Sequence, residues 1–134
     1  MKYLAISLNG MIISGISYLF GGIDAPLITL CIFMIIDYIT GIINAIFVKK
    51  NLSSQIGFFG IVKKILILAL IVLATLLEQN IGISGIRLVV LIWYIGNEGI
   101  SILENLVSIG LPIPVKIKEI LESFQDESRT NVKR

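Results

Sequence analysis

Apolar residues fall in four long blocks along the chain, and short breaks rich in glycine, charge or proline separate the blocks. The blocks cover residues 3–22, 26–48, 61–80 and 87–108. Each block meets or approaches the roughly 20 residues that a helix needs to cross the hydrocarbon core of a bilayer. Apolar residues run continuously within a block, whereas the strands of a membrane barrel alternate apolar and polar residues. The pattern therefore predicts about four transmembrane helices.

The pattern changes after the fourth block, where Pro112 and Pro114 are expected to end the membrane helix. Apolar residues then recur at helical spacing among charged ones, which predicts a short amphipathic helix on the inner leaflet or against a neighbouring subunit. From about residue 126 the chain is expected to be disordered. The predicted fold is an all-α integral membrane protein, with a transmembrane helical domain over 1–111 and a cytoplasmic amphipathic helix and tail over 112–134.

The first block, residues 3–22, has two other interpretations. Lys2 before an apolar stretch is typical of a signal peptide, but polar residues dilute the core of the block and the following sequence stays hydrophobic. Cleavage is therefore not expected. An interfacial helix is the more serious rival to a span, because small and polar residues gather on one face. These residues are Ser7, Gly10, Ser14, Ser17 and Gly21.

Composition agrees with a membrane environment and excludes several kinds of site. Hydrophobic residues make up 56% of the 134 residues, above the 45–50% or so of soluble domains. The net charge of +2, without a basic patch interleaved with aromatic residues, gives no reason to expect a nucleic acid partner. Histidine is absent and Cys31 is the only cysteine, so thiolate or histidine metal sites and intramolecular disulfides are excluded. We expect no cofactor and no metal.

Basic residues orient the predicted helices, because lysine and arginine gather in cytoplasmic loops. Five of them follow the fourth block, and the two remaining connections carry none except Arg87 at an edge. Both termini are therefore predicted to be cytoplasmic. The connection between the second and third blocks carries four lysines, which we expect to anchor the helices at the membrane surface: Lys49, Lys50, Lys63 and Lys64.

Polar residues lie on one face of the second block and on one face of the fourth. An acidic residue in the middle of a span costs about 2.5–3.5 kcal/mol, so these faces need polar partners or water. The partners could lie within one monomer, at a subunit interface, or along a water-filled opening, and we favour the last two. The candidate pore or interface residues are Asp37, Thr40, Gly41 and Asn44 in the second block, and Asn97, Glu98, Ser101, Glu104 and Asn105 in the fourth.

An enzyme is not expected, because the only acidic groups within these two faces are Asp37, Glu98 and Glu104, and no catalytic motif surrounds them. A secondary transporter would show paired inverted halves, and none are visible. A small ion channel, or an accessory subunit of another membrane complex, stays open as an alternative.

Four short motifs, in this order and spacing, resemble the bacteriophage holin family, which includes toxin-export holins. They are Asp-Tyr-Ile-Thr-Gly at 37–41, the lysine-rich connection from 49 to 64 with its glycines, Glu-Gly-Ile-Ser-Ile-Leu-Glu-Asn at 98–105, and Gly-Leu-Pro-Ile-Pro at 110–114. The resemblance covers about residues 26–125.

The resemblance implies a lesion-forming protein of the bacterial cytoplasmic membrane. Such a protein forms homo-oligomers in the lipid bilayer, and it then lets a folded endolysin or toxin leave the cell as cargo. No chemistry is implied, and no established role attaches to any single residue.

Overall fold

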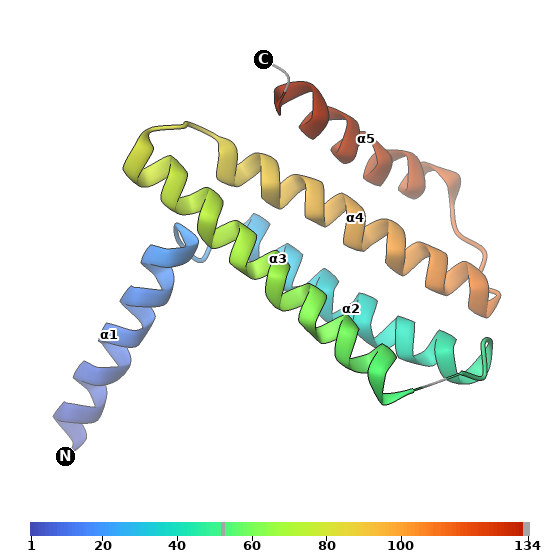
Figure 1. Ribbon diagram of the computed structural model, residues 1–134, viewed down its shortest axis with the longest axis horizontal. Helices are drawn as coiled ribbons and strands as arrows, with labels where there is room; N and C mark the ends of the chain where they lie inside the picture. Colours follow the sequence, from blue (N-terminus) through green and yellow to red (C-terminus); the bar gives the residue numbers. More distant parts are fainter. Residues whose placement is uncertain (52, 133–134) are drawn as a thin grey trace.

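The computed structural model describes residues 1–51 and 53–132, and every regular element in that part of the chain is an α-helix. Figure 1 shows the arrangement of the five helices. They are α1 (Lys2–Phe20), α2 (Ala25–Phe47), α3 (Ser54–Ile81), α4 (Ile86–Ile109) and α5 (Val115–Val132). The all-helical fold is confirmed.

Capping residues set the ends of these helices. The Asp24 carboxylate accepts a hydrogen bond from the Leu27 amide at 3.2 Å, and the Ser53 hydroxyl accepts one from the Ile56 amide at 3.3 Å, so both helices begin on a side-chain cap. Gly21 ends α1 and Gly82 ends α3, each in the left-handed conformation that glycine adopts without strain. The breaks in the apolar pattern are therefore the ends of helices.

Three helices are long and apolar enough to cross a bilayer: α2, α3 and α4. The apolar part of α1 covers only Ile6–Phe20, which is shorter than a span needs. Polar Lys2 at one end and the turn at Gly21 at the other limit its length. The structure thus supports a multi-helix membrane protein with three long apolar helices and one shorter one, and the expected fourth span is not confirmed.

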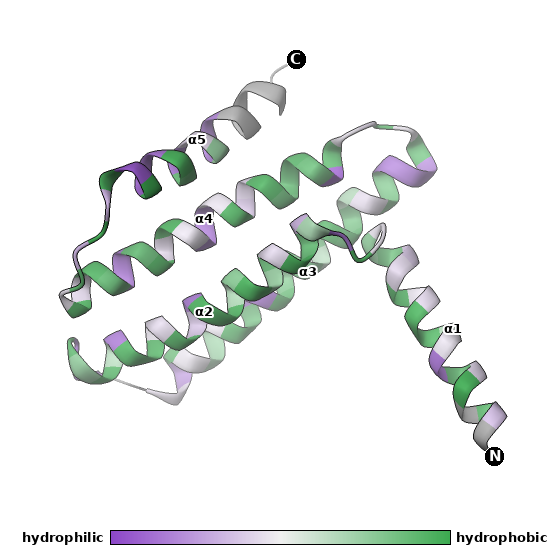
Figure 2. Cartoon of the chain, turned by 180° about the vertical axis from the view of Figure 1, so that it is seen from behind, coloured by the Kyte–Doolittle hydropathy of each residue, from purple (hydrophilic) through white to green (hydrophobic). Residues whose placement is uncertain are grey.

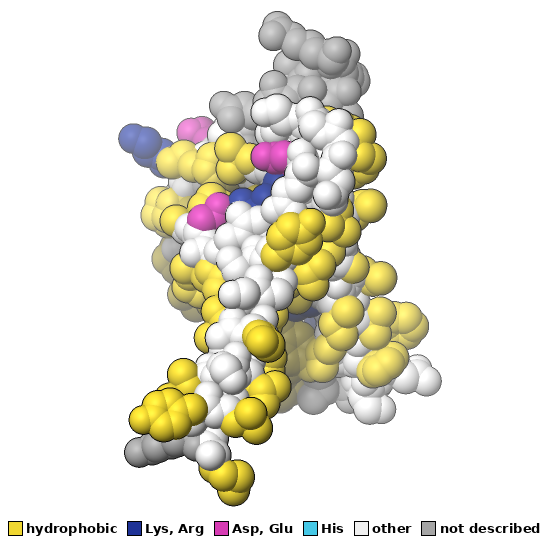
Figure 3. All heavy atoms as spheres, turned by 90° about the vertical axis from the view of Figure 1, so that its left-hand side faces the viewer, with side chains coloured by type: hydrophobic (Ala, Val, Ile, Leu, Met, Phe, Trp, Pro, Cys, Tyr) yellow, Lys and Arg dark blue, Asp and Glu magenta, His cyan; other side chains and the backbone are white. Residues whose placement is uncertain are grey.

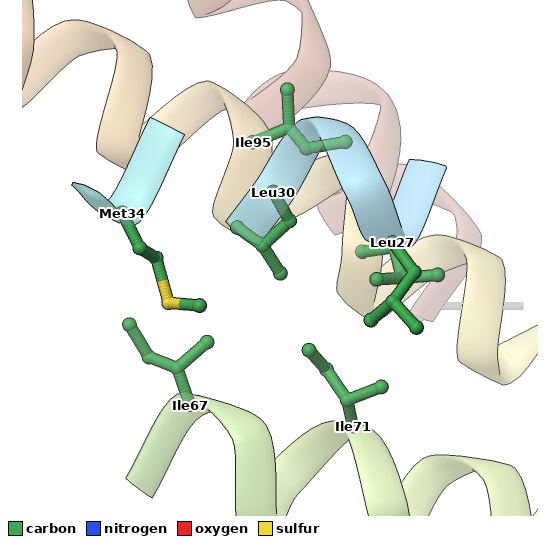
Figure 4. Packing of buried hydrophobic residues seen from close by; sticks show 7 residues of the cluster. Leu27, Leu30, Met34, Ile67, Ile71 and Ile95 are labelled. Atoms are coloured by element: carbon green, nitrogen blue, oxygen red, sulfur yellow. The ribbon is translucent and has the colours of Figure 1, made fainter. Parts of the chain in front are cut away.

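A small apolar core joins α2, α3 and α4. Its buried members are Leu27, Leu30, Met34, Ile67, Ile71, Leu91 and Ile95. Figure 4 shows Ile67 and Ile71 pointing from α3 toward side chains of α2. α4 packs most extensively against α2, whereas α2 and α3 touch only sparingly. The core fixes the register of the three helices, and that register determines which polar groups meet.

Hydrophobic side chains also cover much of the outer surface. α2, α3 and α4 are mainly hydrophobic along their length (Figure 2), and Figure 3 shows apolar side chains over much of one face. Ile35 is 59% exposed on α2, Leu66 is 63% exposed on α3, and Val107 is 58% exposed on α4. A surface of this kind is stable in lipid and would aggregate in water.

α1 stands apart from the other helices at a wide angle (Figure 1). It packs mainly against α3, and at its C-terminal end the Phe20 carbonyl oxygen accepts a hydrogen bond from Arg87 of α4. Its apolar side chains are exposed along its length, including Leu8 at 52% and Ile12 at 56%. The position of α1 leaves both of its predicted interpretations, a span or an interfacial helix, in place.

α5 runs back along α4 in the opposite direction (Figure 1). Leu121 is 8% exposed, and it packs where Gly96 and Gly99 leave room on α4. A Cβ at Gly96 would lie 2.9 Å from the Leu121 carbonyl oxygen, so the two helix backbones approach closely. The predicted apolar stripe packs within the chain only in part: Leu121 and Phe124 lie against α4, whereas Ile117 and Ile120 stay 45% and 48% exposed.

The helix also extends further than its amphipathic pattern predicted. We expected disorder from about residue 126, but α5 continues to Val132. No glycine or proline lies between Val115 and Val132, so nothing in the sequence breaks the helix there. The side chains from residue 127 onward lie outside the described part of the structure.

Candidate intramembrane polar network

Lys64 lies between two acidic side chains from different helices. Its Nζ is 2.7 Å from Oδ2 of Asp37 on α2 and 2.5 Å from Oε2 of Glu98 on α4. The Glu98 side chain is 1% exposed, and those of Lys64 and Asp37 are 15% and 16% exposed. One ammonium group therefore joins the three long apolar helices at a site from which the protein itself excludes most solvent.

Neutral polar side chains extend this cluster along α2 and α4. Asn105 Nδ2 donates to Asp37 Oδ1 at 3.4 Å and to Thr40 Oγ1 at 3.2 Å. Asn44 Nδ2 donates to Asn105 Oδ1 at 3.3 Å, and the Ser108 hydroxyl donates to Asn44 Oδ1 at 2.9 Å. We call the ion pairs and these hydrogen bonds together the polar network.

Helical spacing explains why these residues meet. Asp37, Thr40 and Asn44 are separated by three and four positions on α2, and on α4 Glu98, Asn105 and Ser108 follow the same face. The apolar core sets the two faces against each other. Within the described part of the chain, every buried side-chain nitrogen or oxygen has a hydrogen-bond partner. Lipid offers no such partners, so polar groups within a bilayer must find them inside the protein.

The structure brings together most, but not all, of the residues predicted from the polar faces. Asp37, Thr40, Asn44, Glu98 and Asn105 belong to the polar network. Their mutual bonding corresponds to the alternative in which partners lie within one monomer. Whether they also line a pore or an oligomer interface stays a prediction.

The remaining four predicted residues lie outside the network. Gly41 faces Asn105, since a Cβ there would lie 3.7 Å from its amide nitrogen. Ser101 borders a pocket between α2 and α3, and Asn97 is half-buried. Glu104 is exposed and borders a second pocket, of about 400 Å³, whose wall also includes Lys118 of α5. Of the two acidic residues of α4, Glu98 belongs to the polar network and Glu104 does not.

Lys64 has a different environment from the other three lysines predicted to anchor the helices. We expected it to anchor the helix at the membrane surface, but its ammonium group is paired with Asp37 and Glu98. Lys49, Lys50 and Lys63 are exposed, as expected of residues at a boundary. The available signal was charge balance, because acidic residues within spans call for a nearby cation.

Arg87 holds the turn between α1 and α2 at the other end of the bundle. Its guanidinium forms two bonds to the Asp24 carboxylate, at 2.7 and 3.0 Å, and also donates to the carbonyl oxygens of Phe20 and Gly22. Bidentate pairing of this kind fixes geometry as well as charge. The Arg87 hydrogen bonds hold the pKa of the Asp24 carboxyl below its usual value.

The lowered pKa of Asp24 predicts a pH dependence of stability. Because the carboxyl of Asp24 has a lower pKa in the native state, its ionised form adds to the free energy of unfolding at pH values above the unfolded-state pKa of about 3.9. This stabilisation is lost as pH falls through the native pKa. We expect Asp24→Asn, which keeps the helix cap, to lower the melting temperature of detergent-solubilised protein at neutral pH, and the difference to shrink as pH falls through the lowered native pKa of Asp24. Equal melting temperatures at neutral pH would contradict this role.

Comparison with known proteins assigns the chain to a family. The model of the bacteriophage holin family matches residues 14–126. An uncharacterized 14.9 kDa protein of Clostridium perfringens is 42% identical over 113 residues, covering 83% of this chain and 85% of that protein. The uncharacterized protein YqxH of Bacillus subtilis is 39% identical over 111 residues, covering 82% and 78%.

A relative with a functional name is the probable holin of Bacillus phage phi105. It is 36% identical over 115 residues, covering 83% of this chain and 84% of that protein. No solved structure matches. Because the family model covers the polar network and all three long apolar helices, the chain belongs to the bacteriophage holin family.

Proposed function

We propose that this protein is a holin: it accumulates in the bacterial cytoplasmic membrane, oligomerises, and opens lesions through which a folded endolysin or toxin leaves the cell. The observation that carries the proposal is the family match over residues 14–126. The probable holin among its relatives supports the same role. Both termini face the cytoplasm in this proposal, as the distribution of basic residues favours.

The polar network supports a mechanism in which monomers first insert in a closed form. With Lys64 between Asp37 and Glu98, each long apolar helix brings one charge of the network into the membrane already paired, whereas Glu104 of α4 stays outside it. A paired group costs much less than an isolated charge in lipid. We propose that association at high density later opens this face, so that part of the network borders water.

α5 supports the second half of this mechanism. Docked on α4, it carries Glu119 and Glu122, both exposed, alongside the middle of a helix that would span the bilayer. Facing lipid, these two carboxylates would cost about 5–7 kcal/mol if glutamate counts like aspartate. We propose that α5 lies at the inner membrane surface while monomers are dispersed. In an assembly, its charged face can meet water, and α5 then docks on α4.

The proposal is tested by inducing the protein in bacteria that contain a soluble cytoplasmic muralytic enzyme and a membrane-potential dye. We expect an abrupt loss of potential followed by a fall in culture turbidity, because a holin lesion passes folded protein. Loss of potential without lysis would point to the alternative, a small ion channel. No change in either signal would point to an accessory subunit of another membrane complex.

Glu104 offers a sharper test within the same assay. Its carboxylate is exposed on α4 and lies outside the network, so Glu104→Leu removes a charge that lipid disfavours by about 2.5–3.5 kcal/mol, if glutamate counts like aspartate, without breaking an ion pair. We expect normal or increased accumulation in the membrane together with delayed or absent lysis. Val107→Leu, at an exposed apolar position on the same helix, is the matched control. Unchanged lysis timing in Glu104→Leu would remove Glu104 from the proposed opening.

A further inference from the structure

An open-sided pocket of about 390 Å³ lies between α2 and α3, and part of α4 closes its deep side. Lys49, just after α2, and Lys63, on α3, both line it. These lysines belong to the end of the bundle that faces the cytoplasm in the proposed orientation. The pocket therefore opens at the level of the inner-leaflet head groups.

Glycines create the space. Gly41 lines the pocket from α2, and Gly57 and Gly60 line it from α3. A Cβ at Gly57 would lie 3.5 Å from the Tyr38 hydroxyl, and one at Gly60 would lie 3.3 Å from the Tyr38 ring. A side chain longer than alanine at Gly57 would therefore begin to fill the pocket.

The charges in the pocket divide into a deep part, where Asp37 and Glu98 share Lys64, and a basic rim without an ion-pair partner among the described residues. At the deep end Asp37 is paired with Lys64. No ion pair or hydrogen bond in the described part of the chain uses the ammonium groups of Lys49 and Lys63, although both line the pocket. Asn51 and Ser101 add neutral hydrogen-bonding groups. The rim offers two positive charges and several donors, which is the chemistry that recognises a phosphate.

Apolar side chains flank the same pocket. Ile42 and Ile56 form part of its wall, and Ile56 is 51% exposed. The neighbouring Phe58 and Phe59 are 65% and 70% exposed. A free phosphate ion gains nothing from contact with an apolar surface, whereas the acyl chains of a lipid can pack along it.

We propose that this pocket binds the head-group phosphate of an anionic phospholipid from the inner leaflet. Basic pockets between membrane helices on the cytoplasmic side are suited to such head groups. The phosphate would bridge Lys49 and Lys63 and so tie the ends of α2 and α3 together, where the two helices otherwise touch only sparingly. The proposal needs the orientation inferred from charge, but it does not need the protein to form lesions.

The test measures lipid retention by the full-length protein in a neutral detergent, using native mass spectrometry with added phosphatidylglycerol or phosphatidylcholine. We expect preferential binding of phosphatidylglycerol. Lys49→Gln/Lys63→Gln should weaken it about thirtyfold, because each lysine near an anionic group contributes about a factor of five. Lys116→Gln/Lys118→Gln removes the same charge outside this pocket, and it should leave binding unchanged.

A second variant separates the pocket from simple charge attraction. Gly57→Leu keeps every lysine but fills the space, so it should reduce phosphatidylglycerol binding as strongly as the double lysine variant. Circular dichroism checks that the variant is folded, and the lysine pair tests the proposal if it is not. Wild-type binding by folded Gly57→Leu, equal binding of the two lipids, or displacement of the lipid by inorganic phosphate at equal concentration would each overturn the proposal. Because no step depends on lysis, failure here leaves the holin role untouched.

Discussion

Replacing Lys64 by methionine is expected to abolish stable accumulation of the protein in the membrane. Lys64 is the only cation paired with Asp37 and Glu98 among the described ion pairs, so Lys64→Met leaves two acidic groups facing each other inside the bundle. The two carboxylates then repel each other without a cation between them. Removing one partner of a buried pair costs about 3–5 kcal/mol. The amount of protein in the membrane fraction, compared by immunoblot, measures the effect.

A neutral version of the same site provides the control. Asp37→Asn/Lys64→Met/Glu98→Gln removes all three charges together, while the amide oxygen introduced by Asp37→Asn can still accept the hydrogen bond from Asn105. Replacing a whole buried ion cluster by neutral groups is often harmless to stability. We therefore expect the triple variant to accumulate like the wild-type protein. A triple variant as poorly accumulated as Lys64→Met would show that the loss arises from packing around the lysine stem and not from unpaired charge.

The triple variant also separates folding from permeabilisation. If the charges serve an opening that borders water, the neutral variant should accumulate but lyse late or not at all in the potential and turbidity assay. If it lyses on schedule, the polar network serves only to join the helices of one monomer. This outcome would contradict the proposed opening of the network while leaving the family assignment intact.

The sequence was sufficient to predict the helices but not the partners of their polar groups. Continuous apolar blocks and capping residues determine local structure, so α2 and α4 lie within one residue of their predicted bounds at each end. The start of the third helix was predicted wrongly: α3 begins at Ser54, seven residues before 61, because the Ser53 cap starts the helix ahead of the apolar block. The polar face containing Asp37 and Asn44 was visible from periodicity alone. What it contacts depends on how α2 is rotated against α4, and that rotation is set by core residues such as Leu30 and Leu91, far apart in the sequence.

Lys64 and α5 are two further cases in which the sequence pattern did not predict the tertiary contacts. Lys63 and Lys64 are adjacent on α3, and only the tertiary packing decides that Lys63 is exposed while Lys64 turns inward. For α5, the amphipathic pattern predicted an apolar face that needs a surface to cover. It did not show that Gly96 and Gly99 on α4 form that surface.

Docking of α5 on α4 is expected to depend on assembly, and a thiol cross-link can report it. In a Cys31→Ser background, Gly99→Cys/Leu121→Cys places one thiol on each helix where a Cβ at Gly99 would lie 2.8 Å from the Leu121 side chain. A short bifunctional thiol reagent that crosses membranes should therefore join them whenever α5 is docked. Gly99→Cys/Ile120→Cys is the matched control, because Ile120 is 48% exposed and lies beside Leu121 on another face.

We expect little α4–α5 cross-linking while monomers are dispersed, and a sharp increase as the potential collapses. The reason is energetic: acidic side chains of α5 that face lipid cost free energy, which packing on α4 must offset, whereas a water-lined assembly removes this cost. Glu119→Gln/Glu122→Gln should reduce the difference by making docking less costly before assembly. Equal cross-linking of the wild-type charged helix before and after the collapse would show that α5 stays on α4 throughout. Its charged face would then need water or a partner even in the closed form.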